Sequence, residues 1–408
     1  PSKLTYLGSH VFAHCCGLTE VIFNELITAI GSYSFYNCSG LMEIGNLPEQ
    51  LTCINRSAFE LCSSLQYVKI PPCVTSLLNN SFAQCTGLTH IDIPESVSYI
   101  GAYAFYFCIA LQYVPLPQFA TYIGESAFYS CRGLTNFTIP DSVTYIGSSA
   151  FFGCIGFVNI TIPPNVASIG NYAFANCTGL QEIHMYDGLV EIGKYAFIFC
   201  DGISYLKLPR NLSTISSYLC RYCSSLSEID IPDNVHSISE GAFQYCRSLV
   251  NITLPHNLSS IGVSAFAFCS SLKNIRFPDN LTVISPYAFQ ECSSLNELRP
   301  NDRLKIIDQY SFFKCLGLIH VEIPEDVTSI AAYAFQQCTN LLSINLGENV
   351  TTISEYCFFR CTSLLKVVFP NSLVALYRSA FENCWSLKEV VFGMNLNQVG
   401  VQVFQNCT

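Results

Sequence analysis

Cysteine is the residue type in this sequence that could do the most chemistry. The chain has 23 cysteines in 408 residues, a number that could supply disulfides, metal sites or reactive thiols. The run His14–Cys16 and the Cys-x-x-Cys segment Cys220–Cys223 contain the residue types of a metal or redox site. The adjacent acids Glu325–Asp326 contain the carboxylates that general acid–base catalysis uses.

None of these groupings is complete as a reactive site. His14–Cys16 has no second pair of ligands at the spacing that a zinc site needs. Glu325–Asp326 follows a proline in a turn, where carboxylates solvate and cap the chain. No glycine-rich phosphate loop lies between a strand and a helix. We therefore predict that the chain is not an enzyme and has no catalytic residue, no metal and no cofactor.

Most of the cysteines belong to an internal repeat. The spacing of the repeated cysteine is 23 residues, except for 24 between Cys38 and Cys62, where the extra residue near Gly45 predicts a small bulge. A phenylalanine stands three residues before each repeated cysteine, with Cys220 as the exception. The repeated cysteines are Cys15, Cys38, Cys62, Cys85, Cys108, Cys131, Cys154, Cys177, Cys200, Cys223, Cys246, Cys269, Cys292, Cys315, Cys338, Cys361, Cys384 and Cys407. Such a column is typical of one structural unit copied many times.

Each copy has the pattern of one coil of a solenoid. Leu88–Ile93 alternates apolar and polar residues at its end, which predicts a half-buried strand. Pro94 predicts a turn, because proline fixes φ and cannot extend a sheet. Val97 and Ile100 return the chain across the core, and we expect Gly101 to permit a tight bend. No coil can bury its own apolar faces, so each needs neighbours above and below.

We predict a repeat solenoid: a right-handed β-solenoid or horseshoe of about eighteen 23-residue coils with a parallel sheet on one face. Residues 1–408 are expected to form a single solenoid that is part of a longer chain. The repeated cysteines should point inward as reduced, buried thiols, because side chains stacked in register are poorly oriented for disulfides.

The repeat also carries a resemblance. The pattern Leu-x-x-Ile-x-Ile-Pro-x-x-Val-x-x-Ile-Gly-x-x-Ala-Phe-x-x-Cys, nearly perfect from Leu88 to Cys108, resembles the BspA-like, or treponemal-type, leucine-rich repeat. The resemblance implies a leucine-rich repeat fold over essentially the whole chain. It also implies a surface protein of a bacterium or mucosal protist, attached to host matrix proteins or to other cells. The family has no shared catalytic residues.

Two positions of each predicted strand should face solvent and form the surface on which repeat proteins usually bind partners. Tyr67, Lys69, His90 and Tyr113 are predicted to form one patch, and Tyr205 and Lys207 a second, because tyrosine is enriched at binding hot spots. A separate tyrosine column precedes the Ala-Phe pair of many repeats. Its rings are expected to stack and stiffen the wall.

We predict a non-catalytic cell-surface recognition or adhesion module; the alternative is a structural block of an intracellular filament, coat or cytoskeletal assembly.

The expected partner is a protein: a host matrix protein, a cell-surface protein or another copy of the chain. Nucleic acid is not expected, because the net charge is −10 and basic residues do not cluster. No stretch approaches the length of a membrane span. If the protein is secreted by a eukaryote, we expect glycans first at exposed turn sites that carry the Asn-x-Ser/Thr sequence. These sites are Asn211, Asn257, Asn280 and Asn349.

Overall fold

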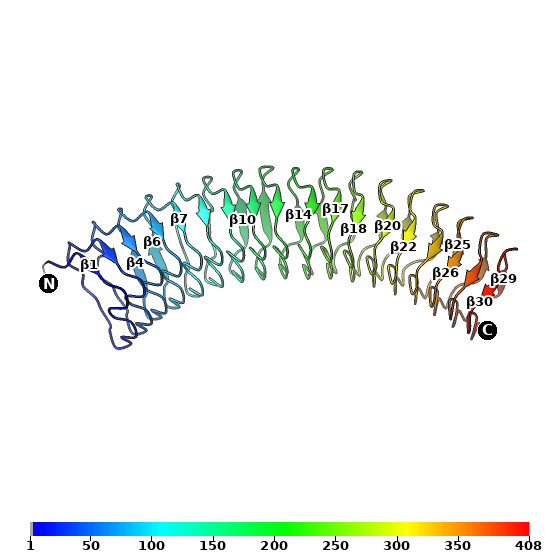
Figure 1. The fold of residues 1–408 in the computed structure, drawn as a ribbon, viewed down its shortest axis with the longest axis horizontal. Helices are drawn as coiled ribbons and strands as arrows, with labels where there is room; N and C mark the ends of the chain where they lie inside the picture. The colour runs from blue at the N-terminus through cyan, green and yellow to red at the C-terminus, as the bar shows by residue number, and fades with distance from the viewer. Residues whose placement is uncertain (1–2, 408) are drawn as a thin grey trace. The chain divides into compact units, whose positions relative to one another are not determined.

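The computed structural model describes residues 3–407 as parallel-strand coils, about 17 turns in all, and these residues contain no helix. Packing divides the chain into two units, Pro1–Ile203 and Ser204–Thr408. Within each unit, strands of successive coils lie side by side (Figure 1). The predicted β-solenoid is confirmed. That residues 1–408 form one solenoid stays a prediction.

The coils form two walls of strands rather than one sheet. We call the wall that contains the predicted strands of three or four residues the strand face. The second wall contains strands of two residues, each of which ends at the position that Ile100 occupies in its repeat. In the first unit the strand face comprises β4 (Tyr67–Lys69), β6 (His90–Asp92), β10 (Asn159–Ile162) and β12 (Glu182–Met185). Its second wall comprises β1 (Tyr6–Leu7), β2 (Ala29–Ile30), β3 (Cys53–Ile54), β5 (Ser76–Leu77), β7 (Tyr99–Ile100), β8 (Tyr122–Ile123), β9 (Tyr145–Ile146), β11 (Ser168–Ile169) and β13 (Glu191–Ile192).

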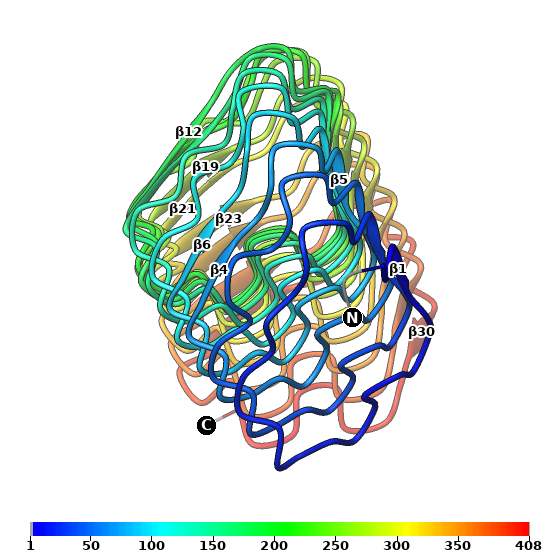
Figure 2. The ribbon, with the colours of Figure 1, turned by 90° about the vertical axis from the view of Figure 1, so that its left-hand side faces the viewer.

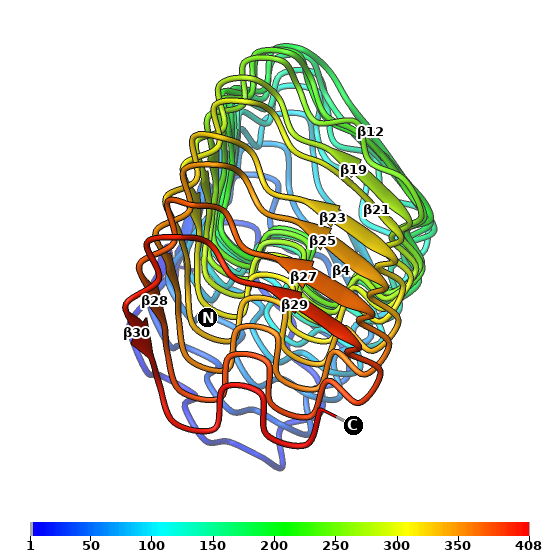
Figure 3. The same cartoon turned by 90° about the vertical axis from the view of Figure 1, so that its right-hand side faces the viewer.

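The second unit repeats this plan. Its strand face comprises β14 (Tyr205–Lys207), β16 (Glu228–Asp230), β19 (Asn274–Arg276), β21 (Glu297–Arg299), β23 (His320–Glu322), β25 (Ser343–Asn345), β27 (Lys366–Val368) and β29 (Glu389–Val391). Its second wall comprises β15 (Thr214–Ile215), β17 (Ser237–Ile238), β18 (Ser260–Ile261), β20 (Val283–Ile284), β22 (Ile306–Ile307), β24 (Ser329–Ile330), β26 (Thr352–Ile353), β28 (Ala375–Leu376) and β30 (Gln398–Val399). The two walls are seen at β4 and β5 in Figure 2 and at β27 and β28 in Figure 3.

The prediction of a sheet on one face was therefore incomplete. The second wall holds a nine-stranded sheet in the first unit, whereas the strand face of that unit is divided into the pairs β4–β6 and β10–β12. Pairing is parallel, and Ala29 opposes Cys53 across the predicted 24-residue spacing. Gly45 has a φ of +55°, which places the expected bulge there.

Between the walls, identical residues stack on one another. Phe35 and Phe59 have parallel rings with centroids 5.2 Å apart, and Phe82 continues the column at 5.4 Å. Repeated cysteines lie beside this column: the Cys62 thiol donates to the carbonyl oxygen of Phe35 at 3.2 Å. Bonds of this kind recur along the column of repeated cysteines, as from Cys85 to Phe59 and from Cys131 to Phe105, so these thiols act as hydrogen-bond donors as well as small apolar groups.

The repeated cysteines of the inner coils are buried and free, as predicted. Burial raises the pKa of Cys177 to about 12 and that of Cys38 to about 11, which keeps both as unreactive thiols at neutral pH. The prediction was wrong for Cys15, which is exposed in the first coil, and for Cys407, which is half-buried in the last. The reason is that a coil is covered by its neighbours on both sides, and these two lie at the ends.

The role assigned to the repeated glycines also needs correction. A Cβ atom on Gly124 would lie 2.5 Å from the carbonyl carbon of Gly101, so these glycines permit close approach of successive coils, and their φ is not positive. Left-handed φ values near +60° occur instead at two other positions of each coil, such as Tyr103 and Phe107. Such a backbone costs roughly 1–2 kcal/mol at a residue with a side chain. Stacking offsets part of this cost, as between Tyr310 and Tyr333, whose ring centroids lie 4.5 Å apart.

Candidate functional site

The first patch is built on the paired strands β4 and β6. Their alternating burial turns Tyr67 and Lys69 outward and Val68 into the core. The register places Tyr67 beside His90 and Lys69 beside Asp92. An isolated bridge continues this row from His90 to Tyr113 on the next coil. The structure therefore brings together the four residues predicted for this patch.

Three aromatic rings form a stack across this patch. The ring centroids of Tyr67 and His90 are 5.7 Å apart, and those of His90 and Tyr113 are 5.9 Å apart, with planes inclined by 4° and 8°. Tyr67 is 46% exposed and Tyr113 is 50% exposed. Because the faces of the rings are turned toward one another, the stack offers mainly ring edges and polar groups to a partner.

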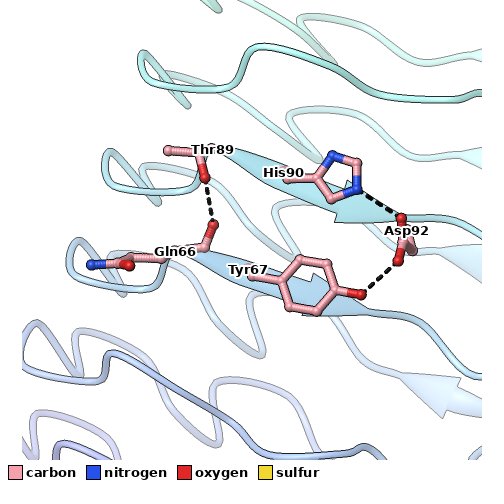
Figure 4. A network of polar contacts seen from close by, with 5 residues as sticks. All are labelled: Gln66, Tyr67, Thr89, His90 and Asp92. Carbon is pink, nitrogen blue, oxygen red and sulfur yellow. Dashed lines mark hydrogen bonds and ion pairs between the residues drawn. The ribbon is translucent and has the colours of Figure 1, made fainter.

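Asp92 fixes this stack and was not among the predicted anchors. Its carboxylate accepts a hydrogen bond of 2.5 Å from the Tyr67 hydroxyl and lies 2.8 Å from Nε2 of His90 (Figure 4). The hydrogen bond from Tyr67 holds the pKa of Asp92 below its ordinary value, and the nearby His90 and Lys69 act in the same direction. The same bond raises the pKa of Tyr67. Beside it, the Thr89 hydroxyl donates to the Gln66 carbonyl at 3.1 Å.

The second patch repeats this arrangement on β14 and β16. The Tyr205 hydroxyl donates to the Asp230 carboxylate at 2.6 Å, and Lys207 opposes Asp230 in the register. This hydrogen bond is the main cause that raises the pKa of Tyr205 to about 12; the negative charge of Glu228 contributes. Tyr205 is 45% exposed. Tyr205 and Lys207 therefore lie together on one strand, as predicted for the second patch.

A simple sequence signal would have found both carboxylates. In each patch a tyrosine at the first outward position is followed 25 residues later by an aspartate at the second outward position of the next coil. We call this pair the Tyr–Asp clasp. Tyr113 has Thr138 at that spacing and no clasp. The signal requires the strand register, because the two residues are diagonal neighbours.

Other residues with reactive side chains are dispersed. His184 lies 3.8 Å from Glu182, and His320 contacts Ser343 through Nδ1. In the described part of the chain, residues 3–407, no group of three or more His, Cys, Asp or Glu side chains is placed to hold a metal ion. The same residues contain no helix long and apolar enough to cross a membrane.

The predicted glycosylation sites are exposed turn residues. Three of them also use their amide groups to join coils: Asn257, Asn280 and Asn349 each donate from Nδ2 to a carbonyl of the preceding coil, at 3.2, 3.4 and 3.0 Å. Asn211 occupies the same turn position and is exposed. Their modification stays a prediction.

Comparison with known proteins agrees with this architecture. Residues 5–135, 121–249, 213–341 and 282–408 match the family described as BspA type Leucine rich repeat region (6 copies). A leucine-rich repeat protein from Bacteroides ovatus is similar, with 29% identity, 84% of this chain and 85% of that chain covered, and a TM-score of 0.68.

Two further solved structures have lower similarity. A leucine rich cell surface protein from Faecalibacterium prausnitzii has 21% identity, with 80% of this chain and 87% of that chain covered and a TM-score of 0.38. The pneumococcal vaccine antigen PcpA has 17% identity, with 82% and 91% covered and a TM-score of 0.46. No curated protein matches the sequence. Because the family repeat extends from residue 5 to residue 408, the chain belongs to the BspA-type leucine-rich repeat family.

Proposed function

We propose that this chain is a non-catalytic recognition module, displayed at a cell surface or secreted, that binds a protein partner through its strand face. The observation that carries the proposal is the exposed Tyr67–His90–Tyr113 stack, held in place by Asp92. Rigid, half-exposed aromatic side chains are typical anchors of protein interfaces. The attachment role implied by the family resemblance supports the same function.

The pattern of variation between coils supports binding as well. Inward positions hold the same residue types in coil after coil, as with Val68, Ile91 and Val114, which are all buried. Outward positions change from aromatic to basic to acidic. A scaffold of equal coils with unequal surfaces suits recognition of one partner at particular coils.

The test replaces Tyr67, Tyr113 and Tyr205 by alanine in the full chain. Loss of a true anchor costs about 2 kcal/mol or more, or about 30-fold in affinity. Beads coated with the chain are scored for attachment to epithelial cells and to a panel of immobilised extracellular-matrix proteins. A matched control replaces Tyr6, Tyr99 and Tyr172, which are also exposed but lie off the strand face.

We expect attachment to fall with the strand-face variant and to persist with the control. Full attachment by the strand-face variant would rule out these anchors. If the unaltered chain attaches to nothing and sedimentation shows ordered polymers instead, the protein is a structural block.

We further propose that Asn211, Asn257, Asn280 and Asn349 carry glycans if the source is a eukaryote. Because these turns lie at the edge of the strand face, glycans there would border the binding surface without covering it. The intact mass of native protein, before and after peptide-N-glycosidase treatment, should then change. An unchanged mass argues against a eukaryotic secretory route.

A further inference from the structure

The strand face is interrupted at several places in the described part of the chain, and two of these interruptions lie next to the patches. In the first unit, pairing ends at the His90–Tyr113 bridge, and the next strand begins at Asn159. In the second unit, β16 ends at Asp230, and Asn251 makes only an isolated bridge to Asn274. The second wall, by contrast, continues past the first interruption through β8 and β9.

Proline and a large aromatic residue explain the first interruption. Pro115 occupies the second outward position, where its missing N–H removes a bond to the preceding coil. Phe137 occupies the next coil at a position that usually holds isoleucine or valine. Its ring packs edge-on against Phe128 and Phe151, with centroids 5.1 and 5.0 Å away. The backbone around Phe137 is positioned by this packing instead of by strand pairing.

The interruptions leave main-chain groups without partners in neighbouring coils. In the intact pairs, the residue after the outward lysine donates to the aspartate carbonyl of the next coil: Ile70 to Asp92 at 2.9 Å and Leu208 to Asp230 at 3.1 Å. Among residues 3–407, no equivalent backbone bond joins Leu116 to Thr138 or Ile231 to Thr253. Such groups can form hydrogen bonds with a ligand that lies in a hollow between the two coils.

A hollow lies at each of the two interruptions beside the patches. The first has a volume of about 550 Å³, with Tyr113, Leu116, Thr138 and Asp141 among its lining residues. The second has a volume of about 540 Å³, with Glu228, Asp230, Asn251 and Thr253 among its lining residues. Volumes of this size fall in the range of ligand-binding clefts. Tyr113 belongs to the first patch and Asp230 to the second, so each hollow is continuous with a patch.

The charged residues that line both hollows are acidic, whereas Lys69 and Lys207 lie on the strand of each patch that is farther from its hollow. Asp141 lines the first, and Glu228 and Asp230 line the second, while the whole chain has a net charge of −10. A partner segment with lysine or arginine side chains would complement these carboxylates and be attracted by the charge of the whole chain.

We propose that each patch and its adjacent hollow form a docking site for an extended, basic peptide segment, so that the chain holds two equivalent sites for one kind of segment. The peptide main chain would lie in the hollow and form hydrogen bonds with the open backbone groups that face it. Its basic side chains would meet the carboxylates, and the tyrosines would pack on its flank. This inference rests on the proposed function and specifies the kind of partner.

The test fills each hollow with a large side chain. Thr138→Trp and Thr253→Trp place an indole in the first and second hollow. Thr161→Trp is the matched control, because Thr161 is also an exposed threonine of the second outward column but lies in the intact β10–β12 pair. Circular dichroism melting of each variant checks that the coils remain folded.

The probe is a fluorescein-labelled octapeptide of alternating lysine and valine, measured by anisotropy and calorimetry with the full chain. We expect two peptides per chain, one with either single variant, at least tenfold weaker binding with the double variant, and no change with the control. An alternating glutamate–valine peptide, and a lysine–valine peptide with N-methylated alternate amides, should bind at least tenfold more weakly.

Three results would overturn the proposal: a stoichiometry other than two, equal binding of the acidic or methylated peptide, or unaltered binding by the double variant. These outcomes are separable from failure of the proposed function. If the tyrosine variant loses cell attachment while the tryptophan variants keep it and still bind peptide, recognition stands and the docking site is wrong. If no tyrosine variant affects attachment, the recognition function itself fails.

Discussion

The two patches share one device and differ in the residue beside it. Both have a Tyr–Asp clasp, with hydroxyl–carboxylate distances of 2.5 Å at Tyr67 and 2.6 Å at Tyr205. The position next to the tyrosine holds His90 in the first patch and Glu228 in the second. His90 extends the aromatic surface to three rings, whereas Glu228 places a negative charge beside a single ring. The clasp therefore orients the tyrosine, while the neighbouring residue sets the charge of the surface.

The largest expected effect comes from the core beneath the patches, which should behave alike in both. Val68 and Leu206 lie under the two clasps and are 1% and 0% exposed. Leu206→Ala should lower the free energy of unfolding by about 2–5 kcal/mol. Val68→Ala should cost less, because fewer buried carbons are lost at ~0.8 kcal/mol each.

Circular dichroism melting curves measure these effects. Tyr67→Ala and Tyr205→Ala serve as controls and should change the stability by less than about 1 kcal/mol, because these side chains are half exposed. If the core and surface variants destabilised the fold equally, the clasps would stabilise the packing of the coils as well as orienting the two tyrosines.

An exchange of the differing residues should convert one patch into the other. His90→Glu removes the middle ring of the stack and should weaken the first patch by roughly 1 kcal/mol. Glu228→His removes a negative charge that helps to raise the pKa of Tyr205, so that this pKa should fall below its value of about 12. Ultraviolet absorbance during alkaline titration reports phenolate formation, and subtraction of the Tyr205→Phe spectrum isolates this residue.

Glu228→Gln is the control, because it removes the negative charge without adding an aromatic ring. It should lower the pKa of Tyr205 in the same direction, because it also removes the charge. A Tyr205 titration that is insensitive to both variants would show that Asp230 alone sets the pKa of the second clasp.

The smallest expected effect is the pH dependence of the clasps. The pKa of Asp92 is lowered in the folded chain, so its contribution to stability is present above its ordinary value near 3.8 and is lost as the pH falls through the folded value. The pKa of Tyr205 is raised, so its contribution is present below pH 10 and is lost as the pH rises toward 12. Each contribution should stay below about 1 kcal/mol, because the groups are exposed.

Stability measured against pH for the unaltered chain, Asp92→Asn and Tyr205→Phe checks both signs. Asp92→Asn should reduce the loss of stability on the acid side, and Tyr205→Phe the loss on the alkaline side. If Asp92→Asn reduced only the alkaline loss of stability, or Tyr205→Phe only the acid loss, the result would contradict the clasp geometry.

Much of the fold could be predicted from the sequence, because a repeat turns one correct coil into all of them. The buried positions of Leu88, Ile91, Ile100 and Cys108 follow from their column, and the inserted residue was correctly placed near Gly45. The outward positions of Tyr67 and Tyr205 also follow, since an alternating strand must expose every second residue.

The remaining features depend on contacts between coils. The clasp joins Tyr67 to Asp92 diagonally, so it becomes visible only when the register is known. The left-handed backbone at Tyr103 has no glycine to signal it, and Gly101 is needed for close approach rather than for a turn. The interruption at Pro115 did have a sequence signal, the missing N–H, which a uniform repeat pattern obscures.

The thiol–carbonyl bonds have a mechanical consequence. Repeated buried cysteines donate to the coil immediately before them, as Cys108 does to Phe82 at 3.1 Å, so these bonds tie a coil to its nearest neighbour. Under tension along the chain, such a stack yields at its outermost coil first and leaves the next one intact. Each released coil supplies 23 residues, or about 80 Å of extended chain. The chain would therefore lengthen coil by coil under tension while the patches on the remaining coils stay folded.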